Sequence, residues 1–344
     1  MTSYFFEDTL VLKNNRGHFM KQGYIYIALS AVLFSTMEVA LKLLSGQFNP
    51  MQMNFLRFFI GSIILLPIAI KNLKKRHLIL NKNDFKFFML TGFICVVVSM
   101  SFYQLSIVYS KASIVAILFS CNPIFVIPFA YFMLGEKIYK HTIVSLIISL
   151  IGLVFILNPF KFTSSILGVV LAFLSAAFFA LYGTISTKKS SRYGGIVCSC
   201  FSFLIGSAEM LILILITKIP VISSWLSNAG YKTFSNIPVI KGITLSNLPS
   251  LIFIGVFITG FGYSFYFLSM EITSAATASI VFYIKPALAP VLSLIILKEA
   301  MGVNTLIGIG FILFSSCITF FFNIRMSRAI HSEEEYKDEE TVII

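Results

Sequence analysis

The sequence predicts an all-α integral membrane protein in which ten membrane-spanning helices form two inverted repeats of five helices. Three observations carry this prediction: an apolar composition, ten apolar segments of spanning length, and a similarity between the two halves of the chain. Apolar residues make up 58% of the 344 residues and charged residues only 12%, with a mean hydropathy of +0.92. Because a typical soluble domain is about a quarter charged, this chain has too little charge to cover a water-facing surface.

Ten apolar segments are long enough to cross a bilayer. A spanning helix needs roughly 20 apolar residues, because the hydrocarbon layer is about 30 Å thick and each residue rises about 1.5 Å. The qualifying segments are 24–44, 51–71, 86–108, 112–134, 141–158, 165–187, 195–217, 249–270, 274–297 and 303–322. Most connections are very short, so neighbouring helices must run antiparallel. The one long connection, 218–248, follows the seventh segment.

The distribution of basic residues predicts the orientation of the chain. The net charge is +12, and the Lys and Arg residues gather in short clusters between apolar segments, most densely from Lys71 to Lys86. Such clusters beside membrane spans favour the cytoplasmic side, and this pattern excludes a nucleic-acid partner. With the N-terminus inside, the inner connections hold most of the basic residues. We therefore expect a multi-pass protein of a bacterial inner membrane with both termini in the cytoplasm.

The two halves of the chain match each other in order and without gaps over long stretches. The matched segments are FYQLS at 102–106 with FYFLS at 265–269 and Pro123 with Pro286, at an offset of 163, and IGS at 60–62 with IGS at 205–207, at an offset of 145. The offset grows by eighteen residues between these segments, which places an insertion in the long connection. Shared hydrophobicity alone does not give so many ordered matches.

The repeat has a geometric consequence, because each half holds an odd number of helices. The second half must then enter the membrane from the opposite side. Inverted repeats are a recurring plan of secondary carriers, in which the substrate site lies between the halves near the midplane of the bilayer. The predicted organisation is a cytoplasmic N-terminal segment over 1–22, a first repeat over 23–160, a second repeat over 161–325, and an acidic cytoplasmic tail over 326–344.

Three longer motifs give the chain a resemblance to a known family. They are FSTMEVALKLLSGQFNPMQMNFLRFFIGS with Lys42, Pro50 and Arg57, NPIFVIPFAYFMLGEKIYKHTIVSLIISLIGLVFIL from 122 onward, and KPALAPVLSLIILKEAMGVNTLIGIGFIL from 285 onward. Over about 22–325 the chain resembles the EamA-type, ten-helix branch of the drug/metabolite transporter superfamily. The resemblance implies export of amino acids or related metabolites. Glu38 and Lys285 depart from the commoner pattern of that family.

A lysine and an asparagine occupy equivalent places beside the two matched prolines. Lys285 precedes Pro286 as Asn122 precedes Pro123. A proline inside a helix removes one backbone hydrogen bond, and helices kinked at matched positions point to the binding site of a carrier. We expect Asn122 and Lys285 to face a central cavity, where Lys285 attracts a carboxylate or phosphate. The alternative is a structural Lys285 paired with Glu38 or Glu209.

Glu38 and Arg57 are further charged groups inside spans, where each needs a partner, water or a function. Three roles are open for Glu38: pairing with a cationic substrate group, carrying a coupling proton, or neutralising Arg57. We interpret Arg57 as mainly structural. Glu136 and Glu299 stand at helix ends, where we expect capping or salt bridges.

Aromatic residues supply a candidate lining for the site. Tyr103 and Tyr266 are repeat equivalents, and Tyr182 in the sixth span and Tyr283 in the ninth could add to the lining. Tyrosine rings stack on planar groups and bond polar edges. Helix packing explains any one of them equally well, so the matched pair is the stronger prediction.

The sequence shows no motif of a hydrolase, a metalloprotease, a nucleotide-binding loop or a dinucleotide fold, so we expect neither an enzyme nor a cofactor. The leading hypothesis is a carrier, monomeric or homodimeric, that exports a small polar metabolite by alternating access, with a proton as a candidate coupling ion. The second hypothesis is uptake or exchange of a larger zwitterionic or nucleotide-like compound. The third is a membrane-embedded enzyme or sensor.

Overall fold

The fold was analysed in a computed structural model of the chain. It describes residues 2–135, 139–157, 165–272, 280–315, 317–318 and 321–322, and for residues 2–20 the backbone alone. The side chains of Pro123 and Tyr283 also lie outside the description.

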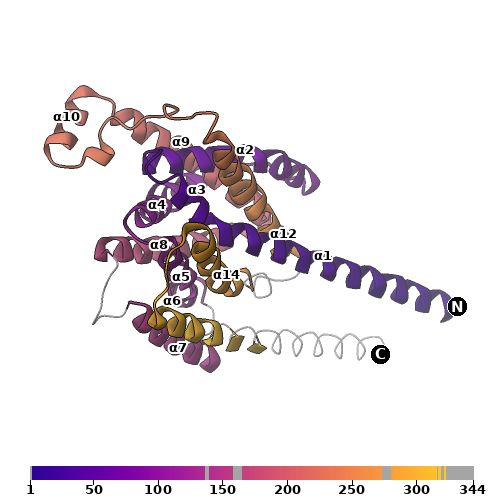
Figure 1. The fold of residues 1–344 in the computed structure, drawn as a ribbon. Helices are drawn as coiled ribbons and strands as arrows, with labels where there is room; N and C mark the ends of the chain where they lie inside the picture. Colours follow the sequence, from indigo (N-terminus) through magenta and orange to yellow (C-terminus); the bar gives the residue numbers. More distant parts are fainter. Residues whose placement is uncertain are drawn as a thin grey trace.

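Ten apolar helices stand where the ten spans were predicted, and they form one bundle (Figure 1). They are α1 (Thr2–Leu43), α2 (Pro50–Lys75), α3 with η1 and α4 (Lys82–Gly92, Phe93–Ser99, Met100–Tyr109), α5 with α6 (Ala112–Ser120, Pro123–Leu134), α7 (Lys140–Leu157), α8 (Ile166–Tyr193), α9 (Gly195–Ile216), α11 with η3 and α12 (Leu248–Ile252, Phe253–Gly262, Tyr263–Ile272), α14 (Ile280–Leu297), and a helix over Val303–Ser315. Within the described residues, seven are long and apolar enough to span a membrane, and three apolar stretches are shorter.

Local sequence explains where several of these helices begin and end. α2 begins because the side chain of Asn49 accepts a hydrogen bond from the amide of Met51, and Pro50 occupies the first helical position. α6 ends at Gly135, whose φ of 71° is the left-handed conformation that closes many helices. The membrane face at which α1 begins is called the N-terminal face below, and the other face the opposite face.

The third and eighth spans each contain a π-helical segment at the same place in the repeat. These are η1 (Phe93–Ser99) and η3 (Phe253–Gly262), which end immediately before α4 and α12. The offset of 163 residues superimposes their last residues, Ser99 and Gly262. Hydrophobic periodicity did not reveal either segment. Short π-helical stretches inside α-helices are frequent at functional sites, and both lie one turn before the matched tyrosines.

The two prolines beside the predicted site have different effects on their helices. In the fourth span the helix is interrupted at Cys121 and Asn122, and α6 starts at Pro123. In the ninth span α14 runs without interruption through Pro286. The repeat therefore preserves the proline but not the break.

The same two repeat positions are joined by a hydrogen bond in both halves, with the donor and the acceptor exchanged. In one half the hydroxyl of Ser30 on α1 donates to the carbonyl of Gly262, at 3.1 Å. In the other the hydroxyl of Ser99 donates to the carbonyl of Ser175 on α8, at 2.8 Å. Ser30 and Ser175 are repeat equivalents, as are Gly262 and Ser99. The sequence repeat is thus also a repeat of helix packing.

The same symmetry holds for the turns that start the third and eighth spans. The amide of Asn81 donates to Oδ2 of Asp84 at 2.9 Å, and the amide of Thr244 donates to Oδ1 of Asn247 at 2.9 Å. These two turns are equivalent at the offset of 163 and lie at opposite faces of the membrane. A carboxylate on one face is replaced by an amide on the other, with the same capping geometry.

Glycines allow the closest helix crossings. A Cβ on Gly92 of α3 would lie 2.6 Å from the carbonyl oxygen of Ser202 and 2.7 Å from the amide nitrogen of Gly206, both on α9. A Cβ on the repeat equivalent of Gly92, Gly255, would lie 2.8 Å from Ile60 on α2. Small residues at such crossings let membrane helices approach closely.

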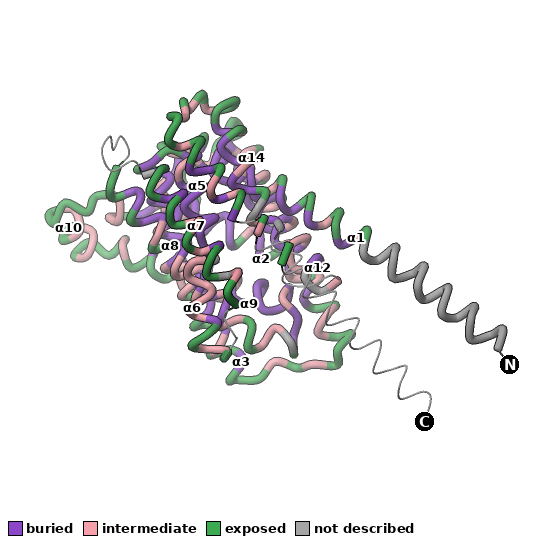
Figure 2. The backbone as a smooth tube through the Cα atoms, turned by 90° about the horizontal axis from the view of Figure 1, so that it is seen from below, coloured by how far each residue is buried: buried purple, intermediate pink, exposed green. Residues whose placement is uncertain are grey.

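Buried residues fill the interior of the bundle, and exposed and intermediate residues form its flank (Figure 2). Large apolar side chains are common on that flank, among them Phe132 at 80% exposure and Val154 at 58%. Exposed apolar side chains over most of a helix bundle are expected where lipid, and not water, surrounds it.

Candidate substrate-binding site

Glu38 and Lys285 form an ion pair in the interior of the bundle. Lys285 Nζ lies 2.6 Å from Glu38 Oε1, and each side chain is 1% exposed. Glu38 lies on α1 of the first repeat, and Lys285 lies on α14 of the second. Burying either charge alone costs several kcal/mol, which a close partner of opposite sign offsets. The pair therefore joins the two halves of the chain by a contact between charges.

Two aromatic residues complete the site. The hydroxyl of Tyr103 on α4 donates to Glu38 Oε1 at 2.5 Å. Lys285 Nζ lies 5.0 Å from the centre of the Phe119 ring and 6.0 Å from that of Tyr103, within the range of cation–π attraction. We call Glu38, Tyr103, Phe119 and Lys285 the charge cluster.

The charge cluster retains hydrogen-bonding capacity. Glu38 Oε2 is buried and accepts no hydrogen bond from the described residues. The ammonium of a lysine has three donors, and in the described part of the chain Lys285 makes one ion pair, with Glu38. A carboxylate could therefore bind Lys285 while an ammonium binds Glu38, and each buried charge would still have a partner of opposite sign.

Arg57 does not neutralise Glu38 in this structure. Among the described residues it forms no ion pair, although the side chain is 1% exposed. Its guanidinium donates to the sulfur of Met100 at 3.2 Å and to the side-chain oxygen Oδ1 of Asn54 at 3.5 Å, and it lies 4.6 Å from the centre of the Phe58 ring. Of the two partners predicted for Lys285, the structure selects Glu38. Glu209 on α9 forms no ion pair within the described residues.

The other predicted site residues take separate positions. Asn122 is buried, but its amide donates to the carbonyl of Ala176 on α8 at 2.8 Å. The hydroxyl of Tyr182 lies 3.2 Å from that of Ser199. The side chain of Tyr283 lies outside the described residues.

Phe119 is the residue of the charge cluster that sequence reasoning did not assign to the site. Its ring meets Tyr103 edge to face, with centroids 4.9 Å apart. In the second repeat, Phe282 meets Tyr266 edge to face at 5.5 Å. These pairs are repeat equivalents, so the matched phenylalanines in the sequence were an available signal. Rings continue from Phe119 through Phe179 to Tyr182, with centroid separations of 5.2 and 5.7 Å.

Glu299 caps the start of α5 at the opposite face. Its carboxylate accepts from the amides of Ala112 at 2.9 Å and Ser113 at 3.1 Å, and from the hydroxyl of Ser293 at 2.6 Å. Burial acts to raise the pKa of Glu299, but these hydrogen bonds outweigh burial and hold the pKa below its ordinary value. The capping role expected of Glu299 is thus seen, and Glu136, its repeat equivalent, lies outside the described residues.

A pocket of about 200 Å³ opens beside Glu299, and Lys42 and Lys111 also line it. Lys42 Nζ donates to the carbonyls of Ile107 and Ser110, each at 2.7 Å, and so caps the end of α4. No member of the charge cluster lines this pocket. We therefore separate the pocket from the candidate substrate site.

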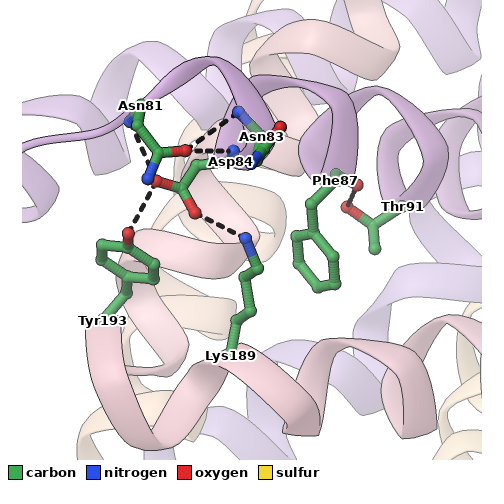
Figure 3. A network of polar contacts seen from close by, with 7 residues as sticks. All are labelled: Asn81, Asn83, Asp84, Phe87, Thr91, Lys189 and Tyr193. Carbon is green, nitrogen blue, oxygen red and sulfur yellow. Dashed lines mark hydrogen bonds and ion pairs between the residues drawn. The ribbon is translucent and has the colours of Figure 1, made fainter.

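A second ionic network stands at the N-terminal face, where α3 begins (Figure 3). Asp84 is 1% exposed, and its Oδ1 lies 2.5 Å from Lys189 Nζ of α8. Its Oδ2 accepts from the hydroxyl of Tyr193 at 2.7 Å and from the amide of Asn81 at 2.9 Å. Lys189 also lies 4.9 Å from the centre of the Phe87 ring. The network ties the first repeat to the second, and sequence reasoning did not predict it.

The ten apolar helices of the described residues, in two repeat halves with a buried charge pair between them, define a multi-pass integral membrane protein. The profile of the EamA-like transporter family matches residues 21–158 and again residues 166–321. The chain belongs to the EamA-like transporter family, which makes it a membrane transporter and not an enzyme. The predicted fold class, with two repeat halves, is confirmed.

Individual relatives agree with this assignment. An uncharacterized transporter of Clostridium kluyveri is 43% identical over 88% of this chain and 94% of its own length. An uncharacterized transporter of Archaeoglobus fulgidus is 27% identical over 84% of this chain and 95% of its own length. The pseudopaline exporter of Pseudomonas aeruginosa is 23% identical over 51% of this chain and 60% of its own length. One crystal structure matches with a TM-score of 0.61 and 15% identity, over 89% of this chain and 98% of that chain, and so shares the fold.

Proposed function

We propose that this transporter is a secondary carrier that exports a small zwitterionic metabolite, an amino acid or a related compound, across the inner membrane by alternating access. The observation that carries the proposal is the buried ion pair between Glu38 and Lys285, which joins the two repeats. A zwitterion carries the same two charges and can replace each partner of the pair. Tyr103 holds the carboxylate of Glu38 in place from a third helix.

The exchange of partners gives a reason for coupling between binding and conformational change. While Lys285 bonds Glu38, α14 and α1 are held together. A substrate carboxylate on Lys285 and a substrate ammonium on Glu38 would release this contact and keep both charges compensated. A substrate with only one charge would leave one buried charge unpaired, at a cost of several kcal/mol. The site therefore favours zwitterions over simple acids and amines.

The orientation of the chain in the membrane and the direction of transport rest on separate arguments. The excess of Lys and Arg in the connections at the N-terminal face supports a cytoplasmic location for that face and for both termini. Export is supported by one distant relative, which is named as an exporter. A proton is the candidate coupling ion, and Glu38 would carry it only while no substrate ammonium is bound to its carboxylate.

The test is counterflow in proteoliposomes with labelled amino acids, nucleosides, and nucleotide-like zwitterions. The double variant Glu38→Gln with Lys285→Met removes both charges at nearly constant volume, so it should fold and fail to transport zwitterions. Each single variant leaves one buried charge uncompensated, which costs about 3–5 kcal/mol. Glu209→Gln serves as the matched control, because it removes a carboxylate within a span but outside the charge cluster.

The outcomes are distinct. Zwitterion transport by wild type and by Glu209→Gln, with none by the folded double variant, supports the proposal. Equal transport by the double variant would return the pair to a structural role. An imposed pH gradient should drive accumulation by wild type, and a response that survives in Glu38→Gln would exclude Glu38 as the proton carrier.

A larger, nucleotide-like zwitterion is the second candidate substrate. The rings of Tyr103, Phe119, Phe179 and Tyr182 favour it, because they form a continuous aromatic wall beside Lys285. Preferential counterflow of nucleotide-like compounds, lost in Phe179→Leu, would select this candidate over amino acids.

A further inference from the structure

The long connection at the opposite face contains a helix that contributes nothing to the core. This connection holds α10 (Pro220–Asn228) and η2 (Lys232–Phe234), and neither contains a buried residue. The repeat offset rises from 145 to 163 across this region, so part of the connection has no counterpart in the first half. Figure 1 shows α10 at the end of the bundle away from the N-terminus.

α10 leaves two large apolar side chains uncovered by the rest of the protein. Ser223 and Ser227 are partly buried, and their hydroxyls lie 2.9 and 2.8 Å from that of Ser235, whereas Ser224 is exposed. Val221 is 78% and Trp225 65% exposed, whereas Ile222 and Leu226 are partly buried. A helix that faces water turns its large apolar side chains towards the protein. The exposed apolar face therefore indicates an apolar neighbour.

The connection is held at a defined place relative to the membrane. The amides of Asn236 and Ile237 donate to the carbonyl and the hydroxyl of Thr217 at 3.1 Å each, which brings the chain back to the end of α9. Ile237 is itself buried, at 3% exposure. The excursion that contains α10 is thus closed at its base.

The apolar face of α10 continues the lipid-facing flank of α9. Ile212 is 58% exposed on α9, followed by Leu215 at 50% and Ile219 at 48%, immediately before Val221. One exposed charged residue, Lys218, lies between the spanning helix and α10, and exposed apolar side chains resume at Ile219. The flank of a membrane span is an interface with lipid, and the face of α10 extends it.

The charges and the tryptophan of the connection fit the headgroup region. Lys218, Lys232 and Lys241 supply positive charge, and the connection from 218 to 248 contains no acidic residue. Basic residues attract anionic headgroups, and tryptophan concentrates at the membrane–water interface.

We propose that α10 lies in the lipid interface of the opposite face, with Val221 and Trp225 at the boundary between acyl chains and headgroups, on an anionic phospholipid surface. Short amphipathic helices bind in this way by combining apolar burial with attraction between basic side chains and anionic lipids. The proposal concerns the bilayer and is independent of the substrate.

Trp225 is the one tryptophan in the 344 residues, so intrinsic fluorescence reports on α10 alone. The full-length protein is reconstituted in vesicles of phosphatidylcholine and phosphatidylglycerol. In one arm the acyl chains carry bromine near the headgroup end. In the other, iodide is present on both sides of the membrane. We expect blue-shifted emission that bromine quenches strongly and iodide quenches weakly.

The control is Ile212→Trp in a Trp225→Phe background, which places a reporter on the flank of a membrane span. Strong quenching by iodide without quenching by bromine would overturn the proposal, since Trp225 would then face water. Quenching by neither would also overturn it and would indicate a contact between copies or with another protein. Replacing phosphatidylglycerol by phosphatidylcholine should weaken bromine quenching at Trp225 but not at the Ile212→Trp reporter.

Discussion

Replacing Asp84 by Asn should remove one ion pair and leave the rest of its network intact. Oδ2 of Asp84 accepts from Tyr193 and from the amide of Asn81, whereas Oδ1 faces Lys189. An asparagine can place its side-chain oxygen at the first position, and its NH2 group at the second cannot accept from Lys189, so the partly exposed lysine would turn to solvent. Its repeat equivalent, Asn247, already caps the matching turn with an amide. The substitution therefore converts this turn into the form found at the other face.

The expected loss of stability follows from burial. A hydrogen bond to a charged group contributes about 1.5–3 kcal/mol, and an exposed ion pair about 0–1 kcal/mol. Asp84 is 1% exposed but Lys189 is 27% exposed, so solvent screens part of the attraction. We expect Asp84→Asn to cost about 1–2 kcal/mol, between these limits. Asp84→Ala also loses the cap and the tyrosine bond, and should cost about 3 kcal/mol.

The assay is reversible unfolding of the purified protein in mixed micelles, followed by circular dichroism. A double-mutant cycle with Lys189→Met isolates the ion pair from the cap. In the Lys189→Met background, Asp84→Asn should cost little, because the charge it removes no longer has a partner. An equal cost in both backgrounds would refute the reasoning and assign the effect to the helix cap.

Three further variants test other contacts. Glu299→Gln should destabilise the protein at neutral pH, because the folded state lowers the pKa of the wild-type carboxyl group and is therefore stabilised by its ionised form. This stabilisation is present above the ordinary pKa of 4.5 and is lost as the pH falls below it. The melting curves of the two proteins should therefore converge in acid. Gly206→Val should destabilise by about 1–3 kcal/mol or more, since the new side chain meets the backbone of Gly92, and unchanged unfolding would contradict the crossing. Tyr103→Phe should keep the fold and raise the substrate concentration for half-maximal counterflow, because Glu38 loses its hydrogen bond; an unchanged value would exclude positioning by Tyr103.

The positions of the helices and the correspondence between the two repeats were predictable, because both leave signals in the sequence. Apolar length identified the spans, and the two offsets identified Tyr103 with Tyr266. The partner of Lys285 could not be chosen from sequence, because Glu38 and Glu209 lie on different helices and pairing depends on how each helix is rotated. The π-helical segments were not predicted, because a wider helical turn leaves no mark in a stretch where almost every residue is apolar.

Asp84 shows a different limit. In sequence, Asn81 and Asp84 have the spacing of a capping box, and the structure contains that box. The second role of Asp84 requires Lys189, which is 105 residues away and on a helix of the other repeat. Nothing in the local pattern distinguishes a carboxylate that caps a helix from one that also bridges two halves.

The pairing of Glu38 with Lys285 has an electrical consequence. A charge that crosses the membrane field exchanges about 2.3 kcal/mol per elementary charge for every 100 mV. Glu38 and Lys285 together carry no net charge, so moving them as a unit between the two faces does no work against the field. Replacing them by a zwitterion leaves that balance unchanged. Any current measured during turnover would then count the ions that accompany the cargo, and the protein itself would be electrically silent at this site.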